Sequence, residues 1–135
     1  MKNIYVVGTL LIVGIVAAAG TTAVFATKYI NSNDTKSADC RSAKNTQNHI
    51  VVIENDTVSP AQSTIAYCDT LTITNKDNKV RLMAFGHHDK HVHYDGVEEK
   101  ELSQGQSFTV TAVSKGTFTF HDHEQDEVQG EFTVN

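Results

Sequence analysis

The pattern of apolar and polar positions divides the chain into three parts. Residues 4–26 contain no charged side chain, and residues 29–48 are polar and show no hydrophobic period. From His49 onward, short apolar runs alternate with polar turns. We therefore predict an N-terminal membrane anchor or signal segment over residues 1–28, a polar linker over 29–48 and a single folded domain over 49–135.

The first apolar segment is long enough to span a membrane. A helix of about 23 residues at ~1.5 Å per residue is about 34 Å long, which covers the hydrocarbon core of a bilayer. A cleaved signal peptide is the alternative, because Val24-Phe25-Ala26 is similar to a small-residue cleavage site. We expect a single-pass protein of the cell membrane with its C-terminal domain outside the cytoplasm, or a secreted protein if the segment is cleaved.

The pattern after the linker is typical of β-strands. Val, Ile, Thr and Phe dominate the runs HIVVIE, TIAY, TLTIT, VRLMAF, SFTVTAV, TFTFH and EFTVN. Apolar and polar positions alternate most clearly from Leu71 to Thr74 and from Phe118 to Phe120. No segment after the anchor shows a helical period of 3.6 residues. We predict an all-β antiparallel sandwich of seven to eight strands.

Length and charge narrow the function classes. The 135 residues leave room for one small domain after the N-terminal segment, which excludes a multidomain enzyme and a large nucleotide-binding fold. Lys and Arg number 11 and Asp and Glu number 16, for a formal net charge of -5. Proteins bind the phosphates of nucleic acids through a cationic surface, which an acidic chain lacks, so we predict no nucleic-acid partner. Nothing in the sequence identifies a protein partner.

Two cysteines, Cys40 and Cys68, lie in the exported part of the chain. An even number of cysteines in an oxidising compartment favours a disulfide. Closing a loop of about 30 residues stabilises a fold by about 3–4 kcal/mol through loop entropy. The alternative is a pair of thiolate metal ligands, but the two cysteines lack the short spacing typical of such sites.

Histidine is the unusual residue, with 7 in the chain. Six of them form two clusters: His87, His88, His91 and His93, then His121 and His123. Neutral imidazole is a common ligand for copper, zinc and nickel. The last two histidines are two positions apart at the end of a predicted strand, so their side chains share a face. If both clusters lie at the same end of the sandwich, up to four imidazoles converge on one divalent ion.

We rank the candidate metal ligands in this order: His121 and His123, then His88 and His91, with His87 and His93 as substitutes. Asp122 is a further candidate, either as a direct ligand or as a carboxylate that orients an imidazole. The simpler alternative is a turn in which Asp122 bonds backbone amides and its neighbours face water. His49 has no partner nearby in sequence and is interpreted as a solvated surface side chain.

Further acidic residues surround the histidines: Asp89, Glu124, Asp126 and Glu127. They are either carboxylates that accept the second N–H of a metal-bound imidazole or an ordinary acidic rim. The sequence leaves both interpretations open.

Three motifs in order carry a family resemblance: Val58-Ser-Pro-Ala-Gln-Ser-Thr-Ile, Asp69-Thr-Leu-Thr-Ile-Thr-Asn-Lys-Asp, and Gly116-Thr-Phe-Thr-Phe-His followed by Gly130-Glu-Phe-Thr-Val. Together they resemble the opening strands and the final hairpin of the plastocyanin-like cupredoxins, over about residues 49–135. The resemblance implies a Greek-key β-sandwich of the cupredoxin type.

The positions that would hold a blue copper ion in that family are changed. A type 1 copper site uses two His, a Cys thiolate and usually a Met. The corresponding positions here hold Arg81, Asp122, Gln125 and Val128. The resemblance therefore implies the fold without the type 1 copper ligands.

The segment Gly116-Thr-Phe-Thr-Phe-His-Asp-His resembles the Gly-Thr-Tyr-Trp-Tyr-His-x-His segment of multicopper oxidases. In those enzymes both histidines bind copper, so the resemblance implies His121 and His123 as copper ligands. The oxidases need further His-x-His motifs and a second domain, which are missing here, so oxidase chemistry is not implied.

We predict a membrane-tethered extracytoplasmic protein that binds Cu(II) for sequestration or transfer and not for blue-copper electron transfer. Nitrogen ligands favour Cu(II) in the Irving–Williams order, with zinc as the competing ion. One alternative is a metal-free interaction module with the same fold. The other is a superoxide-dismutase-like copper enzyme, suggested by His91-Val92-His93 but without the expected bridging histidine. We favour a binding protein over an enzyme.

Overall fold

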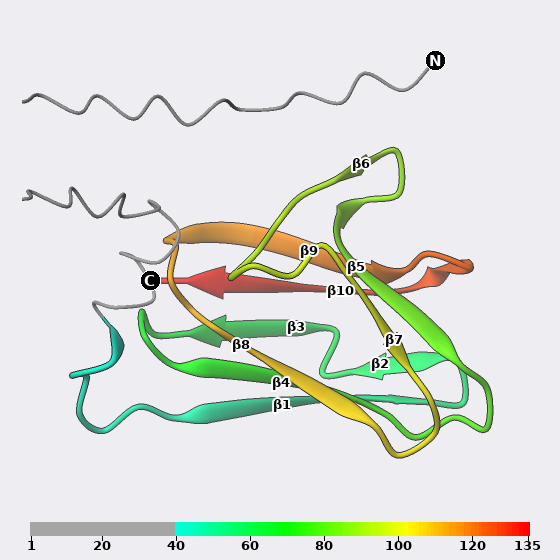
Figure 1. Ribbon diagram of the computed structural model, residues 1–135, viewed down its shortest axis with the longest axis horizontal. Helices are drawn as coiled ribbons and strands as arrows, with labels where there is room; N and C mark the ends of the chain where they lie inside the picture. Colours follow the sequence, from blue (N-terminus) through cyan, green and yellow to red (C-terminus); the bar gives the residue numbers. More distant parts are fainter. Residues whose placement is uncertain (1–39) are drawn as a thin grey trace, which may run out of the picture.

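Ten β-strands in two sheets make up the computed structural model of the chain, which describes residues 40–135 (Figure 1). The predicted anchor over residues 1–28 and most of the linker over 29–48 lie outside the described residues. Within residues 40–135, no helix has the length and apolar character needed to cross a membrane. The described part therefore bears on the fold of the predicted domain and not on the anchor.

One sheet has four strands in the order β2-β1-β4-β8. Their bounds are β1 Asn48–Glu54, β2 Thr57–Ser59, β4 Thr70–Asn75 and β8 Ser107–Thr111. In β4, partly exposed and buried positions alternate over the whole strand, as the period of two predicts for a strand with one face in the core.

The second sheet has six strands, with the order β3-β10-β9-β5-β6 and β7 paired to β5. Their bounds are β3 Gln62–Ile65, β5 Arg81–His87, β6 Lys90–His91, β7 Glu99–Leu102, β9 Gly116–Asp122 and β10 Gln125–Val134. This sheet carries both predicted histidine clusters, because β5 lies directly beside β9.

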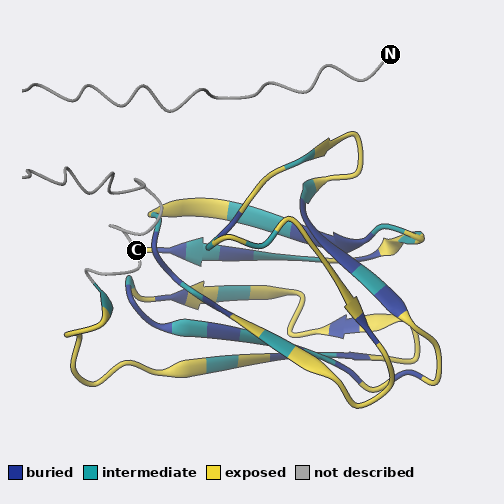
Figure 2. Ribbon diagram, in the orientation of Figure 1, coloured by how far each residue is buried: buried dark blue, intermediate teal, exposed yellow. Residues whose placement is uncertain are grey.

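The core lies between the two sheets and is formed by buried side chains from both of them (Figure 2). Leu71 and Ile73 from the first sheet and Phe120 and Phe132 from the second are at most 1% exposed. Burying a side chain of this size stabilises the fold by roughly 1.5–3 kcal/mol. The apolar runs of the sequence thus form the sandwich core, as predicted.

The strand pairing differs from the predicted antiparallel arrangement in two places. β1 runs parallel to β4, and β3 runs parallel to β10. The chain passes to the second sheet at β3 and returns to the first at β4, so β1 and β4 are not joined by a hairpin. β2, β6 and β7 raise the number of strands from the predicted seven or eight to ten, and each is too short to show a period of two.

The predicted disulfide joins Cys40 to Cys68. It connects the chain before β1 to the turn between β3 and β4. The interpretation of His49 as a solvated side chain is wrong. Its Nε2 atom lies 2.9 Å from the carboxylate of Asp69, which belongs to the same turn. Asp69 also accepts a hydrogen bond from the Gln47 amide, and these bonds lower the pKa of its carboxyl. The start of the domain is therefore pinned by a covalent and a polar link.

The long polar segment after β5 has one aromatic anchor. Tyr94 is 3% exposed, and its ring packs against Phe118 at a centroid distance of 4.6 Å and against Phe132 at 5.1 Å. The next residue, Asp95, accepts a hydrogen bond from the Thr111 amide at 2.7 Å. These contacts fix a segment whose sequence shows no strand pattern.

Candidate metal centre

Four imidazoles meet beside the end of β9. His121 lies in β9 and His123 directly follows that strand, whereas His88 lies in the turn after β5 and His91 ends β6. Phe120 points into the core, so the alternation of side chains along a strand directs His121 to the opposite face. The imidazoles therefore gather outside the sandwich core.

The pairing of β5 with its neighbours brings the two sequence clusters together. Ala84 of β5 lies opposite His121 of β9. Gly86, also in β5, lies opposite His91, which follows the turn into β6. Gly86 permits this turn, because its φ of +92° favours glycine. An added Cβ would also lie 2.4 Å from the backbone oxygen of Lys90. The sequence of the turn thus folds the first cluster back over the second.

The four rings are in close contact. His123 lies between two of them, with centroid distances of 4.9 Å to His88 and 4.8 Å to His91. His121 completes the group, 5.2 Å from His91 and 5.8 Å from His88. Four residues separated by up to 35 positions in sequence therefore share one small volume.

One of the four rings is fixed by a hydrogen bond, because His121 Nδ1 lies 2.9 Å from the Gly86 carbonyl oxygen. In a neutral imidazole, a proton donated from Nδ1 leaves the lone pair on Nε2. Metal-binding histidines in proteins show this arrangement, because the acceptor fixes the ring and its tautomer. The Nδ1 atoms of the other rings lie near carboxylates, at 2.7 Å for His88 with Asp126 and 3.0 Å for His91 with Glu99.

His121 is the most buried of the four, with 4% of its surface exposed. Its Nε2 atom is buried and has no hydrogen-bond partner. Burial lowers the pKa of His121, and the hydrogen bond to the Gly86 carbonyl opposes this shift without reversing it. The ring is therefore neutral at pH 7 and presents an unpaired lone pair, which costs free energy unless a cation or donor satisfies it.

The potential ligand atoms fall into two groups that share one residue. The first comprises His88, His121 and His123, and the second comprises His91, Glu99 and His123. Within each group the ligand atoms lie within 4.8 Å of one another. The four predicted imidazoles thus converge, but they are arranged as two overlapping triads.

Glu99 was not among the residues expected at the site. Its Oε1 atom lies 3.0 Å from His91 Nδ1 and 3.3 Å from His123 Nδ1. It is placed there by β7, which pairs with β5 so that Glu99 lies opposite Ala84. Ala84 of β5 also lies opposite His121 of β9, so its small side chain is placed between Glu99 on one neighbouring strand and His121 on the other. No local pattern indicates this register.

Other predicted residues lie apart from the two triads. His87 is exposed, and His93 pairs instead with Glu98 at 3.1 Å. Asp122 faces the opposite side of β9, where its carboxylate binds Arg81. Of the acidic residues expected around the site, Asp126 contacts a histidine, whereas Glu127 accepts a hydrogen bond from a glutamine side chain.

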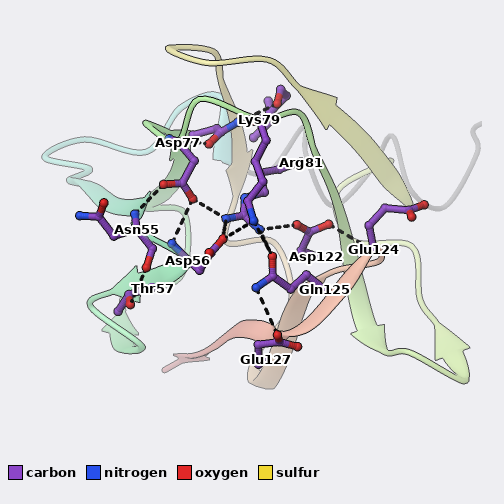
Figure 3. Close-up of polar contacts among 12 residues, drawn as sticks. Asn55, Asp56, Thr57, Asp77, Lys79, Arg81, Asp122, Glu124, Gln125 and Glu127 are labelled. Carbon is purple, nitrogen blue, oxygen red and sulfur yellow. Dashed lines mark hydrogen bonds and ion pairs between the residues drawn. The ribbon is translucent and has the colours of Figure 1, made fainter.

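The inner side of this end of the sandwich holds a network of ion pairs (Figure 3). The Arg81 guanidinium, 0% exposed in its side chain, binds the carboxylates of Asp56, Asp77 and Asp122. Its Nη1 also lies 3.0 Å from the side-chain oxygen of Gln125. Burial lowers the pKa of Arg81, but the three carboxylates raise it by more, so the net shift is upward and the group stays charged.

This network includes three of the four positions that correspond to type 1 copper ligands in the resemblance described above. Arg81 donates hydrogen bonds to both Asp122 and Gln125, and Val128 is buried at 0% exposure. The arginine supplies the positive charge there, and none of these side chains offers the thiolate or imidazole of a blue copper site.

A family model described as a cupredoxin-like domain matches residues 15–134. No curated protein matches the chain. Among solved structures, the chain is similar to a purple cupredoxin from Nitrosopumilus maritimus, with 19% identity and a TM-score of 0.58. That match covers 64% of this chain and 99% of the other.

Amicyanin is a second structural relative. An oxidized amicyanin variant has 17% identity and a TM-score of 0.55, and the match covers 64% of this chain and 81% of the other. A reduced Cu(I) form of another amicyanin variant has 16% identity and a TM-score of 0.55, with 70% and 87% covered. At these identities the likeness concerns the fold.

Proposed function

The chain belongs to the cupredoxin-like domain family, and from this premise we propose that it binds Cu(II) through His88, His91, His121 and His123. The role would be to sequester the ion or to transfer it, outside the cytoplasm, with residues 1–28 holding the domain at the membrane. The observation that carries the proposal is the buried Nε2 of His121, which has no partner among the described residues.

The donor set favours copper over other divalent ions. Imidazole nitrogens bind Cu(II) more strongly than zinc or nickel in the Irving–Williams order. Both cysteines are joined in a disulfide, so no thiolate competes for the ion or produces blue-copper absorption. Zinc binds the same donors with lower intrinsic affinity and is the ion against which selectivity is measured.

The exposure of the rings supports sequestration or transfer. The side chains are 52% exposed at His88, 35% at His123 and 13% at His91, and the deepest ring is His121. A partner could therefore reach the outer ligands while the inner ones still hold the ion. Exchange of ligands one at a time is the ordinary route by which a bound ion passes between two proteins without release to water.

Titration of the full chain in detergent micelles with Cu(II) tests the proposal. We expect binding with nitrogen hyperfine structure in the electron paramagnetic resonance spectrum and no intense thiolate band. The His121→Ala/His123→Ala variant should lose this binding, whereas the matched control His93→Ala should retain it. Unchanged copper affinity in the double variant contradicts the proposal, and absence of binding in the unmodified chain favours a metal-free interaction module.

A further inference from the structure

His123 belongs to both triads of potential ligands, and this sharing sets how many ions fit. We infer that the centre holds two divalent cations, with the His123 ring between them. This inference rests on the proposed metal-binding function and adds the number of ions, the identity of Glu99 as a ligand and the role of His123 as a bridge.

The second triad has the spacing of a ligand set. His123 Nδ1 lies 3.2 Å from His91 Nε2 and 3.3 Å from Glu99 Oε1. Ligands about 2.0–2.1 Å from a tetrahedral ion are roughly 3.3–3.4 Å apart. One cation between these three residues would therefore need only small movements of the side chains.

The first triad contains the same residue. Because Nδ1 of His123 contacts the second triad, we assign its Nε2 to an ion shared with His88 and His121. His121 offers its buried Nε2 without a partner among the described residues, and Nδ1 of His88 lies 2.7 Å from the Asp126 carboxylate. A single ion bound by all four imidazoles fits less well, because the ligand atoms of the four rings do not form one group within 4.8 Å.

Local charge allows two cations to lie close together. Glu99 supplies a carboxylate to the second ion, and Asp126 lies beside the first through His88. When both nitrogens of His123 bind metal, the ring releases its N–H proton to solvent and becomes an anion between the two cations. Two divalent cations on opposite sides of one imidazole ring repel each other strongly unless an anion lies between them.

The experiment measures the number of Cu(II) ions bound by the full chain in detergent micelles, by equilibrium dialysis and electron paramagnetic resonance. The first equivalent should give a copper signal. The second should remove most of that signal, because two Cu(II) ions joined by one imidazolate couple magnetically. The Glu99→Gln variant should bind one ion and keep its signal, and the neighbouring control Glu98→Gln should bind two.

Each other result is decisive. One ion in the unmodified chain overturns the two-ion inference and leaves the proposed copper binding intact, whereas no ion overturns the proposed function itself. Two ions with additive signals, or two ions in Glu99→Gln, place the second ion elsewhere and overturn the bridge. Circular dichroism of each variant verifies that the sandwich is folded.

Discussion

The two faces of β9 differ in how their polar side chains are paired at the end of the β-sandwich. On the inner face, Asp122 meets Arg81, and positive and negative charges neutralise each other within the protein. On the outer face, His121 and His123 lie in groups with other imidazoles and Glu99, and among the described residues no Lys or Arg forms an ion pair with Glu99. Adjacent residues of one strand thus belong to an ion-pair network and to a candidate metal site.

The inner network joins several elements at this end of the sandwich through one side chain. Arg81 connects the β1–β2 turn, the segment before β5 and the end of β9 through Asp56, Asp77 and Asp122. These links lie on the face of β9 opposite the imidazoles, so we expect the stability of the domain and the binding of metal to respond to different substitutions.

The largest effect is expected from breaking the inner network. Arg81→Met leaves buried carboxylates without their partner, and we expect the free energy of unfolding to fall by about 3–5 kcal/mol. Chemical denaturation measures this change. The control Lys79→Met removes an ion pair to the half-exposed Asp56 and an exposed hydrogen bond to Gln125, and should have a much smaller effect. Equal effects of the two substitutions would contradict the role given to Arg81.

Strain in the turn between β5 and β6 should affect the outer face next. Gly86→Ala places a Cβ against the Lys90 carbonyl at a positive φ, and we expect a loss of about 1–3 kcal/mol together with weaker Cu(II) binding. Gly96→Ala is the matched control, since Gly96 also has a positive φ but open space around an added Cβ. Denaturation and copper titration of both variants separate crowding from backbone strain. Normal copper affinity in Gly86→Ala would contradict the geometry of the turn.

Bound copper should stabilise the domain through the outer face. An ion that binds only the folded chain adds about 2.7 kcal/mol when its free concentration is 100 times the dissociation constant. Thermal unfolding of the full chain with and without Cu(II) measures this gain. His121→Ala/His123→Ala should show no gain, whereas His93→Ala should show the full gain. A gain in the double variant would place the ion elsewhere.

The smallest effect concerns acid stability of the inner face. Burial raises the pKa of Asp77, but the hydrogen bonds from Arg81 and from backbone amides lower it by more, so its folded pKa lies below the unfolded value of 3.8. The stability that this carboxylate contributes is complete above the unfolded pKa and is lost as the pH falls through the folded one. Acid titration followed by circular dichroism should show Arg81→Met unfolding at a higher pH than the unmodified chain. Identical acid transitions in Arg81→Met and the unmodified chain would contradict the stabilising role given to the ion pair between Asp77 and Arg81.

Local sequence patterns were sufficient where one strand determines the geometry. The alternation of Phe118 and Phe120 with their neighbours places His121 on the outer face and Asp122 on the inner face, without knowledge of the rest of the fold. Each of the seven apolar runs likewise contributes to a strand, although Ala66 and Tyr67 of the run TIAY lie in the turn after β3. The disulfide followed from the count of cysteines and the predicted compartment, and the structure contains it.

Patterns failed where the geometry depends on pairing between distant strands. Glu99 reaches the imidazoles because β7 aligns with β5, and a strand of three charged residues and Leu102 contains no pattern that indicates this register. Asp56 and Asp77 likewise reach Arg81 from separate turns. The expected ligand role of Asp122 belongs to the same class, because the partner that occupies its carboxylate lies 41 positions away.

X-ray absorption spectroscopy of the copper-loaded full chain tests the central claim most directly, that imidazoles on the outer face of β9 are the ligands. The account predicts a nitrogen and oxygen shell with the outer-atom scattering typical of several imidazoles and no sulfur, and its disappearance in His121→Ala/His123→Ala. A sulfur ligand, or an unchanged imidazole shell in the double variant, would contradict it.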